Sequence, residues 1–309
     1  MRVLLIVNSS ASSVTARGRV VIGKALSADH DVTVAETTRR GHATRLAQGA
    51  AADGVDVVVV LGGDGTLNEA ANGLAGTDTA LAPLPGGSTN VFARTLGLPD
   101  DPIEATGVLL DALAHDSMRR VGLGSVNGRY FLFHVGIGFD AAVVAEVERR
   151  GSLKRWANHV LFGWAALDTW ARRYDRNRPH FAVRVPGTPT VDDALFTVCL
   201  NTDPYTFIGA RPFTLAPEAT LDRGLAVVTL RTLDAAPLIG VVLSALGSGT
   251  RLRRSRHVAH QVDVTEVVID AYDPVPGPVP YQVDGDYLGD LEHLEIHHEP
   301  DILRLVIPR

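Results

Sequence analysis

About the first 120 residues alternate short apolar runs with segments of helical periodicity. The apolar runs are continuous, as in the four valines and Leu61 that precede Gly62. Continuous apolar strands separated by helices are typical of a parallel sheet that is covered on both faces. The pattern predicts strands over residues 2–8, 31–36, 55–62 and 79–85, each followed by a helix.

The pattern changes near residue 121, where VGLGSVNGRYFLFHV reads as two short strands joined at Asn127-Gly128. An Asn-Gly pair between apolar runs is a strong hairpin signal. Most later segments also read as short strands, with helical segments near 153–173 and 235–247. We therefore expect a parallel α/β domain over residues 1–121 and an antiparallel β-sandwich domain over 122–298, with about 299–309 returning to the first domain.

Small polar residues follow each predicted strand of the first domain. In parallel sheets the carboxyl ends of the strands lie at one edge, and ligands bind just outside that edge. Four such exits together indicate a binding site more strongly than any one of them. The exits are Asn8-Ser9-Ser10, Thr37-Thr38, Gly62–Thr66 and Gly86–Asn90.

Two of these exits are rich in glycine, which lets backbone N–H groups come close to a phosphate. The helix expected after Gly65 adds positive partial charge at its N-terminus. Asp64 is unexpected there, because a carboxylate repels phosphate, unless it holds Mg²⁺ or accepts a proton. The alternative is a simple Asp-Gly turn. No Lys-Ser or Lys-Thr pair follows, so this is not a Walker A loop.

A glycine pattern of the dinucleotide-binding type, GxGxxA, occurs at residues 136–141. The second strand with an acidic end, which that fingerprint requires about 20 residues later, is missing. We therefore expect a tight turn into a helix there and no NAD site.

The composition, 46% apolar and 21% charged residues over 309, is that of an ordinary soluble protein. No apolar run reaches the roughly 18–20 residues of a membrane span. The N-terminal apolar run is too short for a signal peptide and reads better as a strand. A single cysteine, Cys199, excludes an internal disulfide and fits a reducing compartment; its apolar surroundings indicate an inert core residue.

The formal net charge of −6 argues against a nucleic-acid-binding protein. Basic residues nevertheless gather in three groups, which indicate either an anionic ligand or surface on one side, or solvated helix ends. The groups are Arg149, Arg150, Lys154 and Arg155; Arg172, Arg173, Arg176 and Arg178; and Arg251, Arg253, Arg254 and Arg256.

With these motifs in hand, the sequence resembles the diacylglycerol kinase catalytic family, the bacterial lipid kinases related to sphingosine kinases. LGGDGTLNEAANGL and PGGSTNVFARTLGLP are similar to that family's two glycine loops, and VNSSAS stands at its first polar turn. VGIGFDAAVV, LAPEATLDRGL and VDGD follow in the family's order. The resemblance extends over essentially the whole chain.

The resemblance implies an ATP-binding α/β domain, a lipid-binding β-sandwich domain and phosphorylation of a lipid hydroxyl with Mg·ATP. Asp64 would assist catalysis near the phosphates. Asp286, where the family has a glutamate, would be the base that activates the hydroxyl. Matching positions for the nucleotide are Asn8, Ser10, Thr37, Gly62, Gly63, Asp64, Gly65, Thr66, Asn68, Gly87 and Ser88.

Three positions depart from the family pattern. Gly122 stands where an aspartate linked to the late acid is usual, so Asp286 would work with Asp64 or water alone. Arg223 replaces the second aspartate of a structural Mg²⁺ site near Thr220 and Asp222, so we expect no structural metal there. Val91 replaces an aspartate in the second glycine loop, with milder consequences.

Two further features concern phosphate and membrane. Arg17, Arg19 and Lys24 follow the first loop and could reach a phosphate. Residues 153–173 contain all three tryptophans, and their apolar positions share one helix face between arginines. This is the pattern of an interfacial helix or of a helix packed on the sandwich, and both hold if the helix roofs a lipid pocket.

The resemblance thus implies a cytoplasmic enzyme, peripheral at the inner face of the membrane, whose partners are lipids and not nucleic acids. It leaves open the acceptor lipid and the oligomeric state, a dimer included. Two alternatives remain: a kinase of NAD or a sugar phosphate, which shares only the GGDG turn, and a nucleotide- and lipid-binding protein with little catalysis, which Gly122 and Asp286 would favour.

Overall fold

The computed structural model describes residues 1–149, 159–272 and 278–309. The chain forms two compact units. Unit 1 comprises Met1–Leu123 with Pro300–Arg309, and unit 2 comprises Gly124–Glu299.

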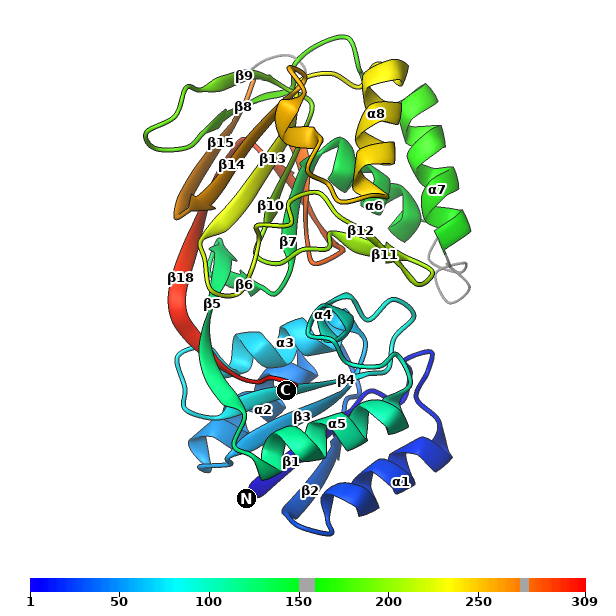
Figure 1. The fold of residues 1–309 in the computed structure, drawn as a ribbon, viewed down its shortest axis with the longest axis vertical. Helices are drawn as coiled ribbons and strands as arrows, with labels where there is room; N and C mark the ends of the chain where they lie inside the picture. The colour runs from blue at the N-terminus through cyan, green and yellow to red at the C-terminus, as the bar shows by residue number, and fades with distance from the viewer. Residues whose placement is uncertain (150–158, 273–277) are drawn as a thin grey trace. The chain divides into compact units, whose positions relative to one another are not determined.

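Unit 1 is built on a parallel sheet in the order β2-β1-β3-β4 (Figure 1). Its strands are β1 (Arg2–Val7), β2 (Asp31–Glu36), β3 (Val57–Gly62) and β4 (Ala80–Pro85). Its helices are α1 (Ala16–Leu26), α2 (His42–Ala52), α3 (Asp64–Leu74), α4 (Val91–Thr95) and α5 (Pro102–Ala114). The end of the last strand, β18 (His293–Val306), also runs parallel to β4, with Leu305 beside Leu81.

Helices cover both faces of this sheet. On one face, Leu5 and Val59 share an apolar cluster with Leu26 of α1 and Leu109 of α5. The alternate positions, such as Ile6, are buried as well. Burial on both faces is why these strands are continuous in apolar residues. The parallel α/β fold expected for this part of the chain is confirmed.

Unit 2 contains two antiparallel layers (Figure 1). One layer has the order β14-β13-β10-β7-β16-β17, and the other runs β18-β15-β8-β9. The strands are β5 (Met118–Val126), which enters from unit 1, β6 (Arg129–Phe131), β7 (His134–Gly138), β8 (Phe181–Arg184), β9 (Val191–Ala194), β10 (Phe196–Leu200), β11 (Thr206–Ile208), β12 (Arg211–Phe213), β13 (Leu225–Leu230), β14 (Val258–Val264), β15 (Glu266–Ala271), β16 (Val279–Val283) and β17 (Asp286–Leu291).

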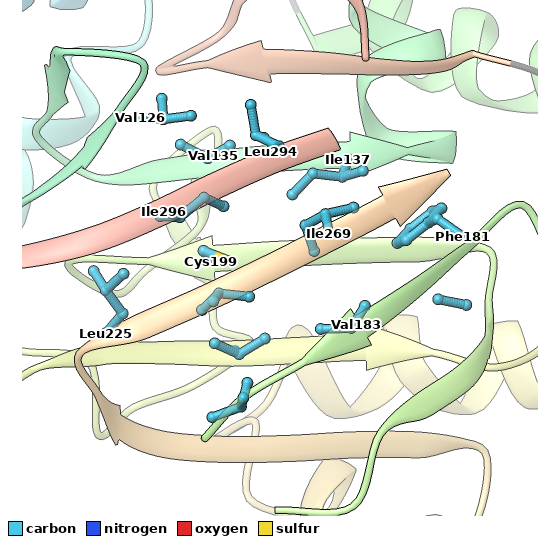
Figure 2. Packing of buried hydrophobic residues seen from close by; sticks show 14 of the residues in the cluster. Val126, Val135, Ile137, Phe181, Val183, Cys199, Leu225, Ile269, Leu294 and Ile296 are labelled. Atoms are coloured by element: carbon cyan, nitrogen blue, oxygen red, sulfur yellow. The ribbon is translucent and has the colours of Figure 1, made fainter. Parts of the chain in front are cut away.

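The core of unit 2 lies between these layers, as Figure 2 shows. Val135 and Ile137 from one layer pack in the same cluster as Ile269 and Ile296 from the other. The expected β-sandwich is therefore confirmed. Cys199 of β10 is fully buried in this cluster, where burial raises the pKa of its thiol to about 12. It is the inert core residue that the sequence predicted.

Helical segments of unit 2 are α6 (Phe139–Arg149), α7 (His159–Asp168), a π-helical turn η2 (Thr169–Arg173), α8 (Ala235–Ala245) and a 3₁₀ turn η3 (Leu252–Arg254). The expected helical face over 153–173 is only partly visible, because Leu153 and Trp156 lie outside the described residues and the side chain of Val160 is not described. Trp164 and Leu167 of this face are exposed, whereas Ala165 is buried. Within the described part of the chain, no helix combines the length and apolar character that crossing a membrane requires.

Candidate active site

The two glycine loops of unit 1 touch each other through their backbones. A Cβ added to Gly87 would lie 2.7 Å from the Cα of Gly63, and one added to Gly86 would lie 2.8 Å from the backbone nitrogen of Gly62. The amide of Gly86 also donates to the carbonyl of Gly62 at 2.9 Å. These glycines are therefore required for contact between the loops.

Gly65 differs from the other loop glycines, because a Cβ there would meet nothing within 4 Å. It lies exposed in the first turn of α3, where the amide of Thr66 donates to the carbonyl of the N-cap Gly63 at 3.0 Å. The first N–H groups of a helix generally lack partners one turn earlier in the helix. An open, positively polarised helix N-terminus can accept an anionic ligand. Gly65 is therefore the position where the bare backbone faces open space.

The first strand exit is tied to the glycine loops by side chains. Asn8 Nδ2 donates to Thr66 Oγ1 at 2.8 Å, and Asn8 Oδ1 accepts from the amide of Ser10 at 3.1 Å. Ser13 Oγ donates to the carbonyl of Gly87 at 3.0 Å. The exits after β1, β3 and β4 thus form one connected group, as their positions in a parallel sheet require.

Thr37 and Ser88 stand at the remaining positions expected for the nucleotide. The amide of Thr37 donates to the carbonyl of Val7 at 2.9 Å, which places the β2 exit next to the β1 exit. Ser88 is exposed in the second loop. Asn68 behaves differently: it is buried, and Asn72 Nδ2 donates to its side-chain oxygen at 3.3 Å.

Asp64 joins the two glycine loops. Its carboxylate accepts from the backbone amides of Val91 at 3.0 Å and Phe92 at 3.2 Å, at the start of α4. Burial raises the pKa of this carboxyl, while the two amides and Arg94 act in the opposite direction. The side chain therefore has a clear structural role, holding α4 against the first loop, in addition to any role near the phosphates.

Asn90 is a loop residue that the motif analysis left aside. Its backbone is left-handed, with φ at 50°, and its side chain is buried. Asn90 Oδ1 accepts from the amides of Gly86 at 3.2 Å and Gly87 at 2.7 Å, and its Nδ2 donates to Asp100 at 2.7 Å. An asparagine three residues after a Gly-Gly pair was the available signal, since asparagine tolerates φ > 0 and bonds to nearby backbone.

The basic residues after the first loop are not equivalent. Arg19 forms an ion pair with Glu36 and donates to Ser9 Oγ at 3.2 Å, so it is held beside the first two strand exits. Lys24 lies in the last turn of α1, at the opposite end of that helix from its N-cap Thr15. A phosphate contact by Arg17, Arg19 or Lys24 stays a prediction.

In unit 2, Asp286 begins β17 directly after a tight turn. Asp284 and Gly285 have φ of 48° and 80°, as in a type I′ hairpin turn. Asp286 forms an ion pair with Arg129 Nη2 at 3.2 Å. Arg129 lies on β6 after the Asn127-Gly128 hairpin, whose φ angles of 50° and 74° confirm the predicted turn. Sequence analysis did not link Arg129 to Asp286, because the two are separated by 157 positions.

Asp284 has a structural role that sequence analysis also missed. Its buried carboxylate accepts from the amides of Leu132 at 2.7 Å, Phe133 at 3.0 Å and His134 at 3.0 Å. These bonds hold the start of β7 against the turn that carries Asp286. The VDGD motif is therefore a rigid turn that presents one carboxylate.

The GxGxxA segment is a tight turn into α6, as expected. A Cβ on Gly136 would lie 1.6 Å from Asp140 Oδ2. Asp140 accepts from Gln282 Nε2 at 2.7 Å and from the hydroxyl of Tyr205. Burial raises the pKa of the Asp140 carboxyl. The glycine thus leaves room for a buried polar cluster inside unit 2.

Gly122 and Arg223 are two of the positions that depart from the family pattern. Gly122 is buried within β5, in unit 1. Thr220, Asp222 and Arg223 are exposed, and the amide of Arg223 donates to the carbonyl of Thr220 at 3.1 Å. Within residues 1–149, 159–272 and 278–309, no group of three or more His, Cys, Asp or Glu side chains could hold a metal ion. Absence of a structural metal at Arg223 stays a prediction.

Residues 2–126 match the family model described as the diacylglycerol kinase catalytic domain. A diacylglycerol kinase of Bacillus subtilis (strain 168) is 39% identical over 121 residues, covering 38% of this chain and 39% of that protein. A Pseudomonas aeruginosa (strain UCBPP-PA14) protein named "Probable lipid kinase YegS-like" is 36% identical over 158 residues, covering 50% and 49%. The matched segments thus span about half or less of these curated relatives.

The fold extends the likeness beyond the matched segment. The crystal structure of a diacylglycerol kinase from Bacillus anthracis str. Sterne aligns with a TM-score of 0.72, covering 99% of this chain and 96% of that one at 21% identity. At this identity the alignment shows the fold alone. The sequence matches confirm the resemblance to the diacylglycerol kinase catalytic family that the motifs indicated.

Proposed function

We propose that this chain is an ATP-dependent lipid kinase that phosphorylates the hydroxyl of a diacylglycerol- or sphingosine-like lipid. The observation that carries the proposal is the pair of packed glycine loops at the carboxyl ends of β3 and β4, followed by the open N-terminus of α3. Phosphoryl transfer depends mainly on positioning and charge stabilisation, which rigid backbone loops supply.

The ATP phosphates would lie against the first turn of α3. The backbone around Gly65 would donate to phosphate oxygens, and Gly63 and Gly87 would keep the loops in register. Asn8, Ser10, Thr37, Thr66 and Ser88 border these loops and would contact the rest of the nucleotide. The Mg²⁺ that accompanies ATP would neutralise phosphate charge, and Asp64 carries the carboxylate suited to orient it.

The acceptor hydroxyl would lose its proton to Asp286. The rigid Asp284-Gly285 turn gives this carboxylate a fixed backbone, and Arg129 fixes its side chain. A general base must be held within hydrogen-bond distance of the proton that it removes. Since Gly122 has no side chain to share a proton with the base, Arg129 would take over the orienting role from the usual aspartate.

The substrate's chemistry also defines where the enzyme would act. A lipid with two acyl chains, or one with a sphingoid chain, stays in a bilayer, so the protein would work as a peripheral enzyme at the inner, cytoplasmic face of the membrane. Such a product belongs to phospholipid metabolism. No nucleic-acid partner is expected for a chain of net charge −6.

The ion pair of Asp286 with Arg129 also supports the second candidate, a nucleotide- and lipid-binding protein with little catalysis. A carboxylate oxygen that already bonds to Arg129 is less available to a substrate hydroxyl. In that case ATP and lipid would bind, and Asp64→Asn would change no turnover.

The test is transfer of labelled γ-phosphate from Mg·ATP to lipids in mixed micelles. The panel would contain diacylglycerol, monoacylglycerol, sphingosine, ceramide and phosphatidylglycerol. One labelled product that disappears in Asp64→Asn and Asp286→Asn would support the lipid kinase and name its acceptor. Tight ATP binding without a labelled product would favour the binding protein. Phosphorylation of NAD or a sugar phosphate would favour the third alternative.

A further inference from the structure

Helix α8 of unit 2 (Ala235–Ala245) is apolar on all sides, with no charged residue in its sequence AAPLIGVVLSA. Its inward positions, Leu238, Val241 and Ala245, pack on the core cluster that contains Phe139 and Leu230. A helix that is apolar all round is normally buried on every side or in contact with lipid. In α8 only one side is covered by the protein.

The opposite face of α8 is exposed and continuous. It is formed by Ile239, Val242, Leu243 and Leu246, at spacings of three, four and seven residues, with exposed fractions of 59%, 38%, 66% and 39%. This spacing places the side chains on one face of the helix. An apolar stripe of this kind normally faces a core, so an exposed one marks an interaction site.

Basic residues follow this apolar face directly. The amide of Gly249 donates to the carbonyl of Ser244 at 2.9 Å, and that of Leu252 to Gly249 at 3.1 Å, so the chain folds back at the end of α8. The next positions place four arginines beside the helix end. They are Arg251, Arg253, Arg254 and Arg256, all exposed.

Positive charge predominates at the C-terminal end of this face. No Asp or Glu occurs from Ala235 to Val262. Glu218 pairs with Arg253 at 2.6 Å and lies 3.8 Å from His260. In a protein of net charge −6, this is a local concentration of positive charge next to exposed leucine and isoleucine.

Helix α7 carries a second group of exposed apolar side chains. Phe162, Trp164 and Leu167 are 43%, 40% and 62% exposed. The turn that follows α7 is fixed to the segment before α8, because Trp170 Nε1 donates to the carbonyl of Leu233 at 2.7 Å. Tryptophan beside aliphatic side chains and arginine is the composition found at membrane interfaces.

From these contacts we infer that the exposed face of α8, with Arg251 to Arg256 at its end, docks this chain on an anionic lipid bilayer. The apolar side chains would enter the boundary between headgroups and acyl chains, and the arginines would contact lipid phosphates. A second copy fits less well, because a symmetric contact through this face would bring two sets of arginines together. The role of this docking, which is to bring the enzyme to its lipid acceptor, rests on the proposed function.

The test is co-sedimentation of the full chain with vesicles of phosphatidylglycerol and phosphatidylcholine in equal parts. The native chain should bind these vesicles, bind vesicles of phosphatidylcholine alone far less, and dissociate at high salt. Ile239→Ser with Leu243→Ser should weaken binding about tenfold or more, because each aliphatic side chain contributes to burial in lipid. Arg251→Glu with Arg254→Glu should also weaken it at least tenfold and remove most of the salt dependence.

Val20→Ser is the matched control, since Val20 of α1 is 58% exposed and lies in unit 1. It should bind like the native chain. The inference is overturned if the native chain ignores anionic vesicles, or if the α8 variants bind as Val20→Ser does. A concentration-dependent dimer that Leu243→Ser abolishes would also overturn it, in favour of a second copy.

The failure of this inference can be separated from failure of the proposed function. Phosphorylation of a short-chain diacylglycerol dispersed in water should be unchanged in the α8 variants, while phosphorylation of the same headgroup in vesicles falls. If no lipid is phosphorylated at all, vesicle binding still decides the docking surface. If short-chain lipid is phosphorylated and vesicle binding is unaffected by the variants, only the docking surface is wrong.

Discussion

The glycine loops of unit 1 and the VDGD turn of unit 2 present a carboxylate in contrasting ways. Asp64 is held by two backbone amides of the neighbouring loop, whose Gly86 and Gly87 pack too closely on Gly62 and Gly63 to admit a Cβ. Asp286 projects from a hairpin turn and is held by one arginine side chain. The first arrangement is made of backbone and depends on residue identity at several positions, whereas the second combines a hairpin turn with an ion pair between side chains.

This difference explains why the sequence of unit 1 matches the family model and most of the sequence of unit 2 does not. The matched family model ends at residue 126, close to the end of unit 1. Loops whose backbones touch, as at Gly86 and Gly87, tolerate few substitutions at the positions in contact. A sandwich core needs only apolar residues of suitable volume, and many sequences satisfy it.

The largest effect is expected from Asp286→Asn, which keeps the shape of the side chain but removes its basicity. Positioned general bases contribute about 10²–10⁴-fold, so phosphoryl transfer should fall by about that factor. The measurement is the rate of lipid phosphorylation at saturating ATP. Asp290→Asn is the matched control, because Asp290 lies on the same strand and accepts from the Tyr287 hydroxyl at 2.9 Å. Equal rates for Asp286→Asn and the native chain would remove Asp286 from the mechanism.

Gly87→Ala tests whether the glycine loops are built by mutual contact. The new Cβ would meet the Gly63 Cα at 2.7 Å, so backbone must shift. Overpacking of this kind costs about 1–3 kcal/mol, and a displaced loop should lower transfer about 10²-fold. Gly65→Ala is the control, since its Cβ meets nothing within 4 Å and its stability should be native or slightly higher. Equal thermal unfolding midpoints for the two variants would contradict the packing account.

His134 offers a test confined to unit 2. Its ring is buried against Tyr205 at 4.4 Å, and burial lowers its pKa to about 3 from 6.5. The unfolded chain therefore binds a proton below pH 6.5 that the folded chain refuses until about pH 3. Lowering the pH through this window should therefore lower the free energy of unfolding, by up to about 1.4 kcal/mol per pH unit. His134→Phe should remove this part of the slope in denaturant titrations.

His293 serves as a comparison of opposite sign. Its pKa is raised, first by its hydrogen bond with Asp270 and then by that with Glu295. The stability it adds is present below pH 6.5 and is lost as pH rises through its raised pKa. His293→Gln should therefore cost stability at acidic pH and little at alkaline pH. For His134, an unchanged dependence of the free energy of unfolding on pH in His134→Phe would contradict the expected role of its burial.

The smallest effect is expected from Cys199→Ala. The thiol is fully buried in the sandwich core, and its removal leaves a small cavity but no unpaired polar group. We expect a loss of about 1 kcal/mol in the free energy of unfolding and native activity. Reaction of the folded native protein with a thiol reagent at neutral pH should be far slower than that of the unfolded chain. Rapid modification with loss of activity would assign Cys199 a functional role.

The sequence predicted the architecture well where periodicity is strong. The helix over 42–52 has the expected bounds, and the helix expected from residue 67 begins three residues earlier, because Gly63 acts as its N-cap. The glycine loops follow β3 and β4 as the sequence predicted, but the reason for their glycines was only partly anticipated. Gly63 and Gly87 leave room for each other's backbone, and among the glycines at 62, 63, 65, 86 and 87 it is Gly65 that faces open space.

Long-range pairings could not be predicted from motifs alone. Arg129 meets Asp286, and Asp284 meets three amides of residues 132–134, only because the sandwich brings β6, β7 and β17 together. The exposure of α8 was equally hidden. Its composition predicts a buried helix, and only the burial of each face shows that one side remains uncovered.

In the proposed function, unit 1 would bind Mg·ATP and unit 2 would supply the base for the lipid hydroxyl. The most direct test is calorimetric titration of Mg·ATP into the native chain, Asp286→Asn and Gly65→Val, with lipid phosphorylation measured on the same preparations. We expect Asp286→Asn to bind Mg·ATP with the native Kd and to transfer phosphate about 10²–10⁴-fold more slowly. We expect Gly65→Val to lose Mg·ATP binding while remaining folded. Native Mg·ATP affinity in Gly65→Val, or phosphoryl transfer in Asp286→Asn at the native rate, would contradict it.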